Sequence, residues 1–147
     1  MIGSTAITFR YAQPADAEAV LEFWSRAAED NARPSDDADA VRRLIAHDPR
    51  ALELAVDVET IVGTLISGFD GWRCALYRLA VEPEKRGQGI ARALLERAEQ
   101  RFIDLRATRA TAMVLDENEV GRDFWRARGY VPQADWSRWV ASLPRPT

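Results

Sequence analysis

The 147-residue chain contains one cysteine, Cys74, and one histidine, His47, and this scarcity excludes two kinds of site. A single cysteine allows neither an internal disulfide nor a cysteine-rich metal centre. A single imidazole does not supply the ligand set of an ordinary zinc enzyme. The longest apolar runs are far shorter than the roughly 18 residues of a membrane-spanning helix. We therefore expect no metal and no membrane partner.

Neither sign of charge dominates the chain. Its 20 Lys and Arg residues and 23 Asp and Glu residues give a net charge of −3, and 47% of the residues are apolar. A nucleic-acid-binding domain usually has a clustered basic surplus, and a disordered chain has a low apolar content. The composition predicts one folded domain over residues 1–147 with no nucleic-acid partner. No targeting segment opens the chain, so we expect a cytoplasmic protein.

Apolar periodicity predicts a mixed α/β fold. Strands are expected at 5–11, 52–57, 61–67, 74–81 and 111–115, with one or two more within 131–140, and helices at 14–28, 37–46, 89–105 and 119–128. The 74–81 run is the most continuously apolar, which is typical of a strand buried on both faces. The expected order is β-α-α-β-β-β-α-β-α-β-β. Its strand-helix-strand crossover calls for a mixed sheet with helices on both faces.

The segment 79–92 joins a predicted strand to a predicted helix through a basic loop that contains glycine. Gly87 and Gly89 have no Cβ, so the backbone bends sharply and a ligand can approach closely. The first amides of a helix have no partner within it, and the helix dipole adds partial positive charge there. A phosphate or pyrophosphate satisfies both conditions. Lys85, Arg86 and Arg92 add formal positive charge nearby. The alternative is a plain strand-loop-helix turn that uses its glycines only for backbone geometry.

The binding free energy that a helix terminus can contribute is too small for this loop to hold a ligand by itself. A charge at a helix terminus contributes about 0.3–2 kcal/mol, whereas micromolar binding needs roughly 8 kcal/mol. The ligand must therefore make further contacts along the strands, as a long cofactor with a central pyrophosphate does. The loop lacks the Gly-Lys-Ser/Thr of a P-loop, and Arg92 stands where the dinucleotide fingerprint needs a small residue.

Two motifs resemble those of the GNAT acetyltransferases. Arg86-Gly87-Gln88-Gly89-Ile90-Ala91 is similar to the family's acyl-CoA pyrophosphate loop, Gln/Arg-x-x-Gly-x-Gly/Ala, and Leu79-Ala80-Val81 resembles the strand before it. Downstream, Asn118, Phe124-Trp125 and Gly129-Tyr130 match the spacing of the family's second block, Asn…Phe-Tyr-x-x-x-Gly-Phe. The resemblance covers nearly the whole chain, and the small bacterial single-domain members look most similar.

The resemblance implies an N-acetyltransferase with acetyl-CoA as co-substrate. Backbone groups at Leu79 and Val81 would pair with the pantetheine arm, and the amides from Gly87 to Arg92 would hold the pyrophosphate. The implied cofactor-binding residues are Leu79, Ala80, Val81, Arg86, Gly87, Gln88, Gly89, Ile90, Ala91, Arg92, Asn118 and Trp125. The acceptor amine would lie against the first two helices and the loop between them.

The catalytic acid and base are less clearly indicated. Trp125 stands where many family members have the Tyr that protonates the leaving thiolate, and an indole N–H is not an acid near neutral pH. Tyr77 and Tyr130 are the candidate replacements, with packing beneath a helix as the other interpretation for Tyr130. Asp70 is the first candidate for the base and Glu82 the second. A turn-forming role is the alternative for Asp70.

The sequence does not distinguish between acceptor classes or between oligomeric states. Five acidic residues of the expected acceptor segment either attract a cationic amine or cap a helix and solvate a loop: Glu29, Asp30, Asp36, Asp37 and Asp39. The acceptor is a small-molecule amine or a protein amine. The alternative function is an acyl-CoA-binding module without turnover, and a third is a regulator that binds a phosphate ligand other than CoA. Trp136 and Trp139 are candidates for the interface of a homodimer.

Overall fold

The computed structural model of the protein describes residues 6–27 and 36–146. Its internal contacts divide the chain into two compact units, Met1–Met113 and Val114–Thr147. Most of the loop predicted at 29–37, including Glu29 and Asp30, lies outside the described residues. Within the described residues, no helix is long and apolar enough to span a bilayer. No group of three His, Cys, Asp or Glu side chains there is arranged to hold a metal ion.

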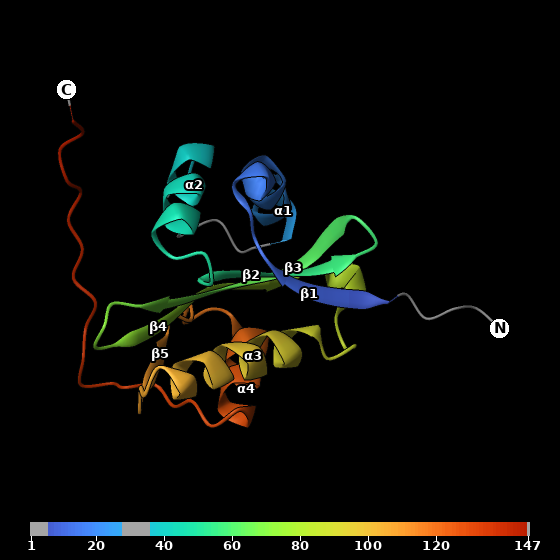
Figure 1. Ribbon diagram of the computed structural model, residues 1–147. Coiled ribbons are helices and arrows are strands. Elements are labelled where there is room, and N and C mark those ends of the chain that lie inside the picture. Colours follow the sequence, from blue (N-terminus) through green and yellow to red (C-terminus); the bar gives the residue numbers. More distant parts are fainter. Residues whose placement is uncertain (1–5, 28–35, 147) are drawn as a thin grey trace. The chain divides into compact units, whose positions relative to one another are not determined.

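The first unit is a five-stranded sheet with helices on its faces (Figure 1). The strands are β1 (Ile7–Tyr11), β2 (Leu52–Asp57), β3 (Thr60–Phe69), β4 (Cys74–Val81) and β5 (Ala110–Ala112). The helices are α1 (Ala17–Ala27), α2 (Ala38–His47) and α3 (Ile90–Asp104), with 3₁₀ turns η1 (Pro14–Asp16) and η2 (Pro83–Lys85). The sheet order is β1-β2-β3-β4-β5, and all pairs are antiparallel except β4–β5. This combination of parallel and antiparallel pairs confirms the predicted mixed sheet. The parallel β4–β5 pair needs a crossover connection, which α3 provides.

Local side-chain contacts fix where the first helices begin. The Asp37 carboxylate accepts a hydrogen bond from the Ala40 amide at 2.7 Å and caps α2. Asp16 accepts a bond from the Gln13 amide at 2.7 Å and pairs with Arg10 at 2.8 Å. These contacts attach the start of α1 to β1.

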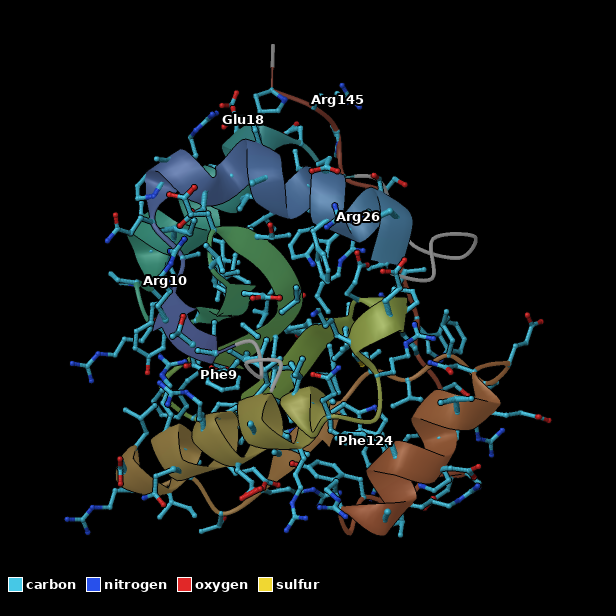
Figure 2. All side chains as sticks on the ribbon, turned by 90° about the vertical axis from the view of Figure 1, so that its right-hand side faces the viewer. Phe9, Arg10, Glu18, Arg26, Phe124 and Arg145 are labelled. Carbon is cyan, nitrogen blue, oxygen red and sulfur yellow. The ribbon has the colours of Figure 1, made fainter. Side chains whose placement is uncertain are left out.

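The core lies on both faces of the sheet. α1 and α2 cover one face, where Phe23, Val20 and Ile45 pack against β2, and α3 covers the other (Figure 1). Neighbouring side chains of β1 point to opposite faces of the sheet. Arg10 bonds to Asp16, whereas the Phe9 ring lies 5.5 Å from the guanidinium of Arg97 on α3 (Figure 2).

The prediction that the 74–81 strand is buried on both faces is wrong. β2 and β3 are the continuously buried strands, while β4 alternates and leaves Tyr77 44% exposed. β2 and β3 lie centrally between the two helical layers. β4 loses its neighbour halfway along, because β5 pairs only with its first residues, Cys74 to Leu76. Apolar sequence alone did not reveal this difference.

The second unit is built around α4 (Glu119–Ala127). The Asn118 side-chain oxygen caps the helix by accepting a hydrogen bond from the Gly121 amide at 2.8 Å. A Cβ on Gly121 would lie 2.3 Å from the Asn118 side-chain nitrogen, so a larger residue there would displace the Asn118 side chain from the cap. Gly129 follows the C-terminal end of the helix, and its φ of +93° is the left-handed cap that the sequence predicted.

The strands predicted within 131–140 are absent from the structure: residues 128–146 form no strand. Pro132 has no N–H for a ladder, and a turn follows it, in which the Trp136 amide approaches the Gln133 carbonyl at 3.4 Å. Trp136 and Trp139 are 74% and 91% exposed. Aromatic content favoured a strand, but a strand also needs a neighbour to pair with.

Candidate active site

β4 contains a bulge that sets the geometry of the site. Opposite β3, Thr64 pairs with Ala80 but Ile66 pairs with Tyr77, so one residue of β3 faces two residues of β4. The bulged residue Arg78 has φ of +56°. This left-handed conformation costs a side-chain-bearing residue on the order of 1–3 kcal/mol, and such strain is often found at functional sites.

Beyond the bulge, one edge of β4 carries no neighbouring strand in the described part of the chain. The last contact on that side is a hydrogen bond from the Met113 amide to the Leu76 carbonyl at 3.3 Å. The Glu82 amide donates to the Val62 carbonyl of β3 at 2.8 Å. Because backbone groups alternate in direction along a strand, Val81 and Leu79 direct their N–H and C=O groups to the open edge. These are the residues that the resemblance assigned to pantetheine.

The loop after β4 ends at the start of α3. Gly87 and Gly89 have φ of +83° and +82°, and Gly89 is the N-cap of the helix without a side-chain cap. A methyl group at either glycine would meet nothing within 4 Å. The first helical hydrogen bond runs from the Ala93 amide to the Gly89 carbonyl at 3.0 Å. Within the described chain, the amides from Gly87 to Arg92 donate to no protein group, so this loop fits a diphosphate.

The basic side chains around this loop differ in their partners. Lys85 is held by Asp57 at 3.1 Å, and Arg92 pairs with Glu96 on the exposed face of α3 at 3.0 Å. Arg86 is exposed and makes no ion pair with a described residue. Of these three cations, Arg86 is therefore the one that a bound anion can recruit without breaking an existing pair.

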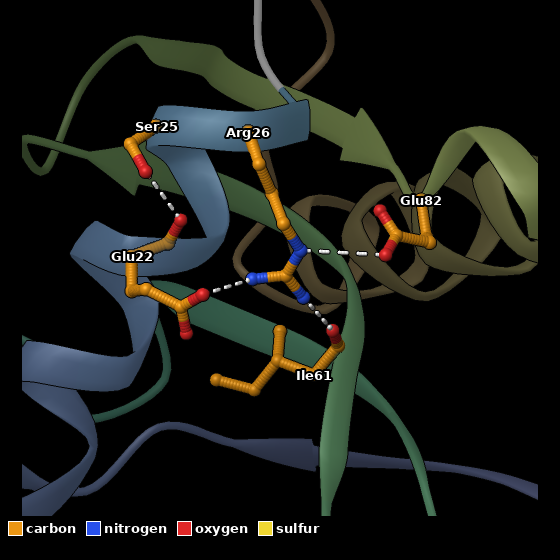
Figure 3. Close-up of polar contacts among 5 residues, drawn as sticks. All are labelled: Glu22, Ser25, Arg26, Ile61 and Glu82. Carbon is orange, nitrogen blue, oxygen red and sulfur yellow. Dashed lines mark hydrogen bonds and ion pairs between the residues drawn. The ribbon is translucent and has the colours of Figure 1, made fainter.

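An arginine of α1 attaches that helix to the beginning of the loop (Figure 3). Arg26 donates to Glu22 at 2.8 Å, to the Ile61 carbonyl at 3.4 Å and to Glu82 at 3.3 Å. Glu82, the second candidate base, is therefore occupied by an ion pair. Its position fixes the end of β4 relative to α1.

Asp70, the first candidate base, lies in the turn between β3 and β4. Its carboxylate accepts hydrogen bonds from the amides of Arg73 and Trp72 at 2.7 and 2.8 Å. These bonds lower the pKa of the Asp70 carboxyl below its usual value, which weakens it as a base. The turn is also separated from Val81 by the length of β4, roughly 20 Å at 3.3 Å per residue. The structure does not bring Asp70 to the loop.

The candidate acids lie in different units. Tyr77 is on β4 next to the bulge, and it is partly exposed where the open edge begins. Tyr130 lies in the second unit, with its ring edge-on to Trp125 at 4.9 Å between ring centroids and its amide bonded to the Trp125 carbonyl at 2.9 Å. Asn118 caps α4 in the same unit. The buried Cys74 has a raised pKa because burial disfavours the thiolate, as befits a packing residue.

Sequence reasoning missed the residues that hold the bulge. Thr64 on β3 is fully buried, donates to the Arg78 carbonyl at 2.8 Å and accepts from the Trp24 indole at 2.9 Å. The Arg78 guanidinium lies 4.7 Å from the Trp24 ring centroid and pairs with Asp36. A threonine in a β-rich run and a tryptophan on an apolar helical stripe give no signal of this contact.

Comparison with known proteins identifies the family of this chain. The acetyltransferase (GNAT) family model matches residues 17–130. An acetyltransferase of Photorhabdus laumondii is 36% identical over 105 residues, which cover 71% of this chain and 72% of that protein. Among solved structures, Ard1 from Thermoplasma volcanium has a TM-score of 0.75 at 19% identity, covering 88% of this chain and 85% of that one.

A second solved structure shares the fold over almost the full length. A predicted acetyltransferase of Clostridium acetobutylicum, solved with acetyl-CoA, has a TM-score of 0.72 at 16% identity. The match covers 92% of this chain and 96% of that one. The resemblance inferred from two short motifs is confirmed, and the chain is an N-acetyltransferase of the GNAT family.

Proposed function

We propose that this chain transfers the acetyl group of acetyl-CoA to a primary amine, on a small molecule or a protein, by direct transfer in a ternary complex. The observation that carries the proposal is the loop of Gly87 to Arg92, whose amides donate to no group in the described chain. It directly follows an open strand edge, so one extended ligand can use both. The Clostridium neighbour solved with acetyl-CoA supports this choice of co-substrate.

The chain's own groups divide the work of binding. The amides from Gly87 to Arg92 hold the diphosphate, with Arg86 adding a charge-assisted contact. Leu79 and Val81 pair through their backbone with the amide-containing arm, in the manner of strand addition. Asn118 fixes the start of α4, and Trp125 belongs to the same block. These roles account for the cofactor-binding set, including Ala80, Gln88, Ile90 and Ala91, whose backbone shapes the strand and the loop.

Acetyl transfer forms a bond from the amine nitrogen to the acetyl carbon, breaks the carbon–sulfur bond, and moves one proton from the amine to solvent or sulfur. A backbone N–H of Leu79 or Val81 on the open edge supplies the donor for the negative oxygen that develops. Tyr77 is the acid candidate on β4 itself, where it lies next to the bulge. Asp70 takes no part in this step, because its carboxylate accepts hydrogen bonds from the amides of the β3–β4 turn. The amine then loses its proton to water.

Two measurements test the proposed function. Calorimetry should show saturable acetyl-CoA binding, and incubation with acetyl-CoA and a panel of amines should release free thiol continuously. Absence of binding refutes the proposal outright. The panel should include polyamines, aminoglycoside-type amines and peptide N-termini, because either acceptor class is compatible with the site. Cytoplasmic location and a single functional domain remain predictions.

A non-catalytic acyl-CoA-binding module is the second candidate. Two observations favour it: Trp125 occupies the position of the family's acid, and both carboxylates considered as bases are engaged, Asp70 by amides and Glu82 by Arg26. Binding of acetyl-CoA without amine-dependent thiol release would support this module. Sustained thiol release would exclude it.

A further inference from the structure

We propose that Thr64 is a positioning residue: its hydroxyl holds the β4 bulge, and the bulge decides which residues of β4 present their backbone to the co-substrate. The inference rests on the proposed function. Thr64 lies on β3, one strand away from the open edge, and touches neither the loop glycines nor any reacting atom. Its proposed action is through the conformation of Arg78.

The Thr64 hydroxyl both donates and accepts a hydrogen bond inside the protein. Its side-chain oxygen donates to the Arg78 carbonyl at 2.8 Å and accepts from the Trp24 indole nitrogen at 2.9 Å. Thr64 is 0% exposed and Trp24 is 6% exposed. The Arg78 carbonyl is partly buried, and leaving it without a partner is costly. The hydroxyl therefore gives the bulged carbonyl a partner inside the protein.

The bulge reverses the direction of the backbone groups that follow it. Before the bulge, the Asp70 amide bonds to the Arg73 carbonyl, so odd-numbered residues of β4 face β3. After it, Glu82 bonds to Val62, so even-numbered residues face β3 and Val81 faces the open edge. A regular ladder would turn the amides of Leu79 and Val81 toward β3 and present Ala80 instead. The extra residue thus selects the binding residues.

The side chain of Arg78 is held from a second direction. Its guanidinium stacks on the Trp24 ring at 4.7 Å and pairs with Asp36, just before α2. Trp24 therefore contacts both the side chain of the bulged residue and the threonine that binds its carbonyl. α1, β3 and β4 meet at this point, and the strained φ of +56° is kept by contacts from α1 and β3 together.

The experiment compares Thr64→Val with Thr64→Ser. Valine keeps the shape of threonine but has no hydroxyl, whereas serine keeps the hydroxyl. Calorimetric affinity for CoA should fall by about tenfold or more in Thr64→Val and stay within about threefold of wild type in Thr64→Ser. With acetyl-CoA, kcat should fall in Thr64→Val as well, because the amides at the reacting carbon are displaced. The rescue by serine distinguishes the hydroxyl from simple packing.

Ser67→Ala is the matched control. Ser67 lies on the same strand, is 5% exposed, and its side-chain oxygen accepts a bond from Arg101 at 3.0 Å. It should lose thermal stability without loss of CoA affinity. Equal affinities in Thr64→Val and Ser67→Ala would overturn the inference. Wild-type protein that fails to bind acetyl-CoA would instead refute the proposed function, so the two failures are distinguishable.

A measurement on wild-type protein tests the register even where Thr64→Val does not fold. In amide hydrogen exchange, the amides of Ala80 and Glu82 should be protected without ligand, because they face β3. Val81 should exchange faster and gain protection on addition of CoA. The opposite pattern, with Val81 protected in the free protein and Ala80 responding to CoA, would overturn the inference.

Discussion

Replacing Gly89 with alanine tests the diphosphate site with the smallest possible change. Gly89 has φ of +82° and caps α3, and an added Cβ would meet nothing within 4 Å. The folded protein therefore tolerates the methyl group sterically. The cost is conformational, about 1–2 kcal/mol for a left-handed residue that is not glycine. We expect a cooperatively folded variant with this loss in the free energy of unfolding.

Gly89→Ala should also lower the affinity for acetyl-CoA, independently of its effect on stability. The methyl group occupies the open space beside the amides and disfavours the loop conformation that aims them. Losing one amide contact to a charged oxygen costs about 1.5–3 kcal/mol, or roughly 10- to 150-fold in affinity. Gly89→Glu should abolish binding, because a carboxylate would then occupy the anion site. Calorimetry with acetyl-CoA measures the affinity, and urea unfolding measures the stability.

Gly71→Ala is the control for backbone strain. Gly71 has φ of +94° in the β3–β4 turn, and its added Cβ also meets nothing within 4 Å. It should lose a similar free energy of unfolding and bind acetyl-CoA as wild type does. Wild-type affinity in Gly89→Ala would refute the reasoning. A loss of affinity in Gly71→Ala equal to that in Gly89→Ala would show that strain alone explains the effect.

Three further predictions follow from single side chains. Arg86→Ala should weaken CoA binding about fivefold at low salt and less at high salt. Arg92→Ala should weaken it less, because Arg92 is already paired with Glu96 on α3. Titrations of both variants at two salt concentrations measure the difference. Arg10 lowers the pKa of Asp16, so Asp16→Asn should lower the free energy of unfolding above pH 4. The difference from wild type should shrink below pH 4 as the wild-type carboxylate is protonated. A pH-independent difference in urea unfolding would contradict this prediction. If protonation of the thiolate limits the rate, Trp125→Tyr should raise kcat for thiol release by up to about 10²-fold, because a phenol can protonate the thiolate. A lower kcat would show that the indole is needed for packing, and an unchanged kcat would show that protonation does not limit the rate.

Part of the fold could be predicted from the sequence because local residue patterns agree with the tertiary structure. The glycine at 129 ends α4 in the left-handed conformation that only glycine adopts easily. The Pro14 and Asp37 signals place the first two helices within a few residues. The apolar spacing of α3 matches its buried residues Leu94, Leu95 and Phe102.

Other features depend on partners that a sequence pattern does not reveal. The apolar run of β4 did not show that β5 stops at Ala112, so its burial was overestimated. The tail around Trp136 has the composition of a strand without a strand beside it. The same limit applies to the site. The left-handed turn at Gly87 and Gly89 was predictable, because glycine adopts positive φ easily. The bulge at Arg78 was not, because its carbonyl bonds to a hydroxyl 14 residues away.

A crystal structure of this protein with bound CoA tests the central claim most directly. We predict the diphosphate oxygens within hydrogen-bonding distance of the amides between Gly87 and Arg92, and the pantetheine arm beside the backbone of Leu79 and Val81. A bound CoA whose diphosphate lies away from this loop, or whose arm pairs with Ala80 instead, would contradict the account.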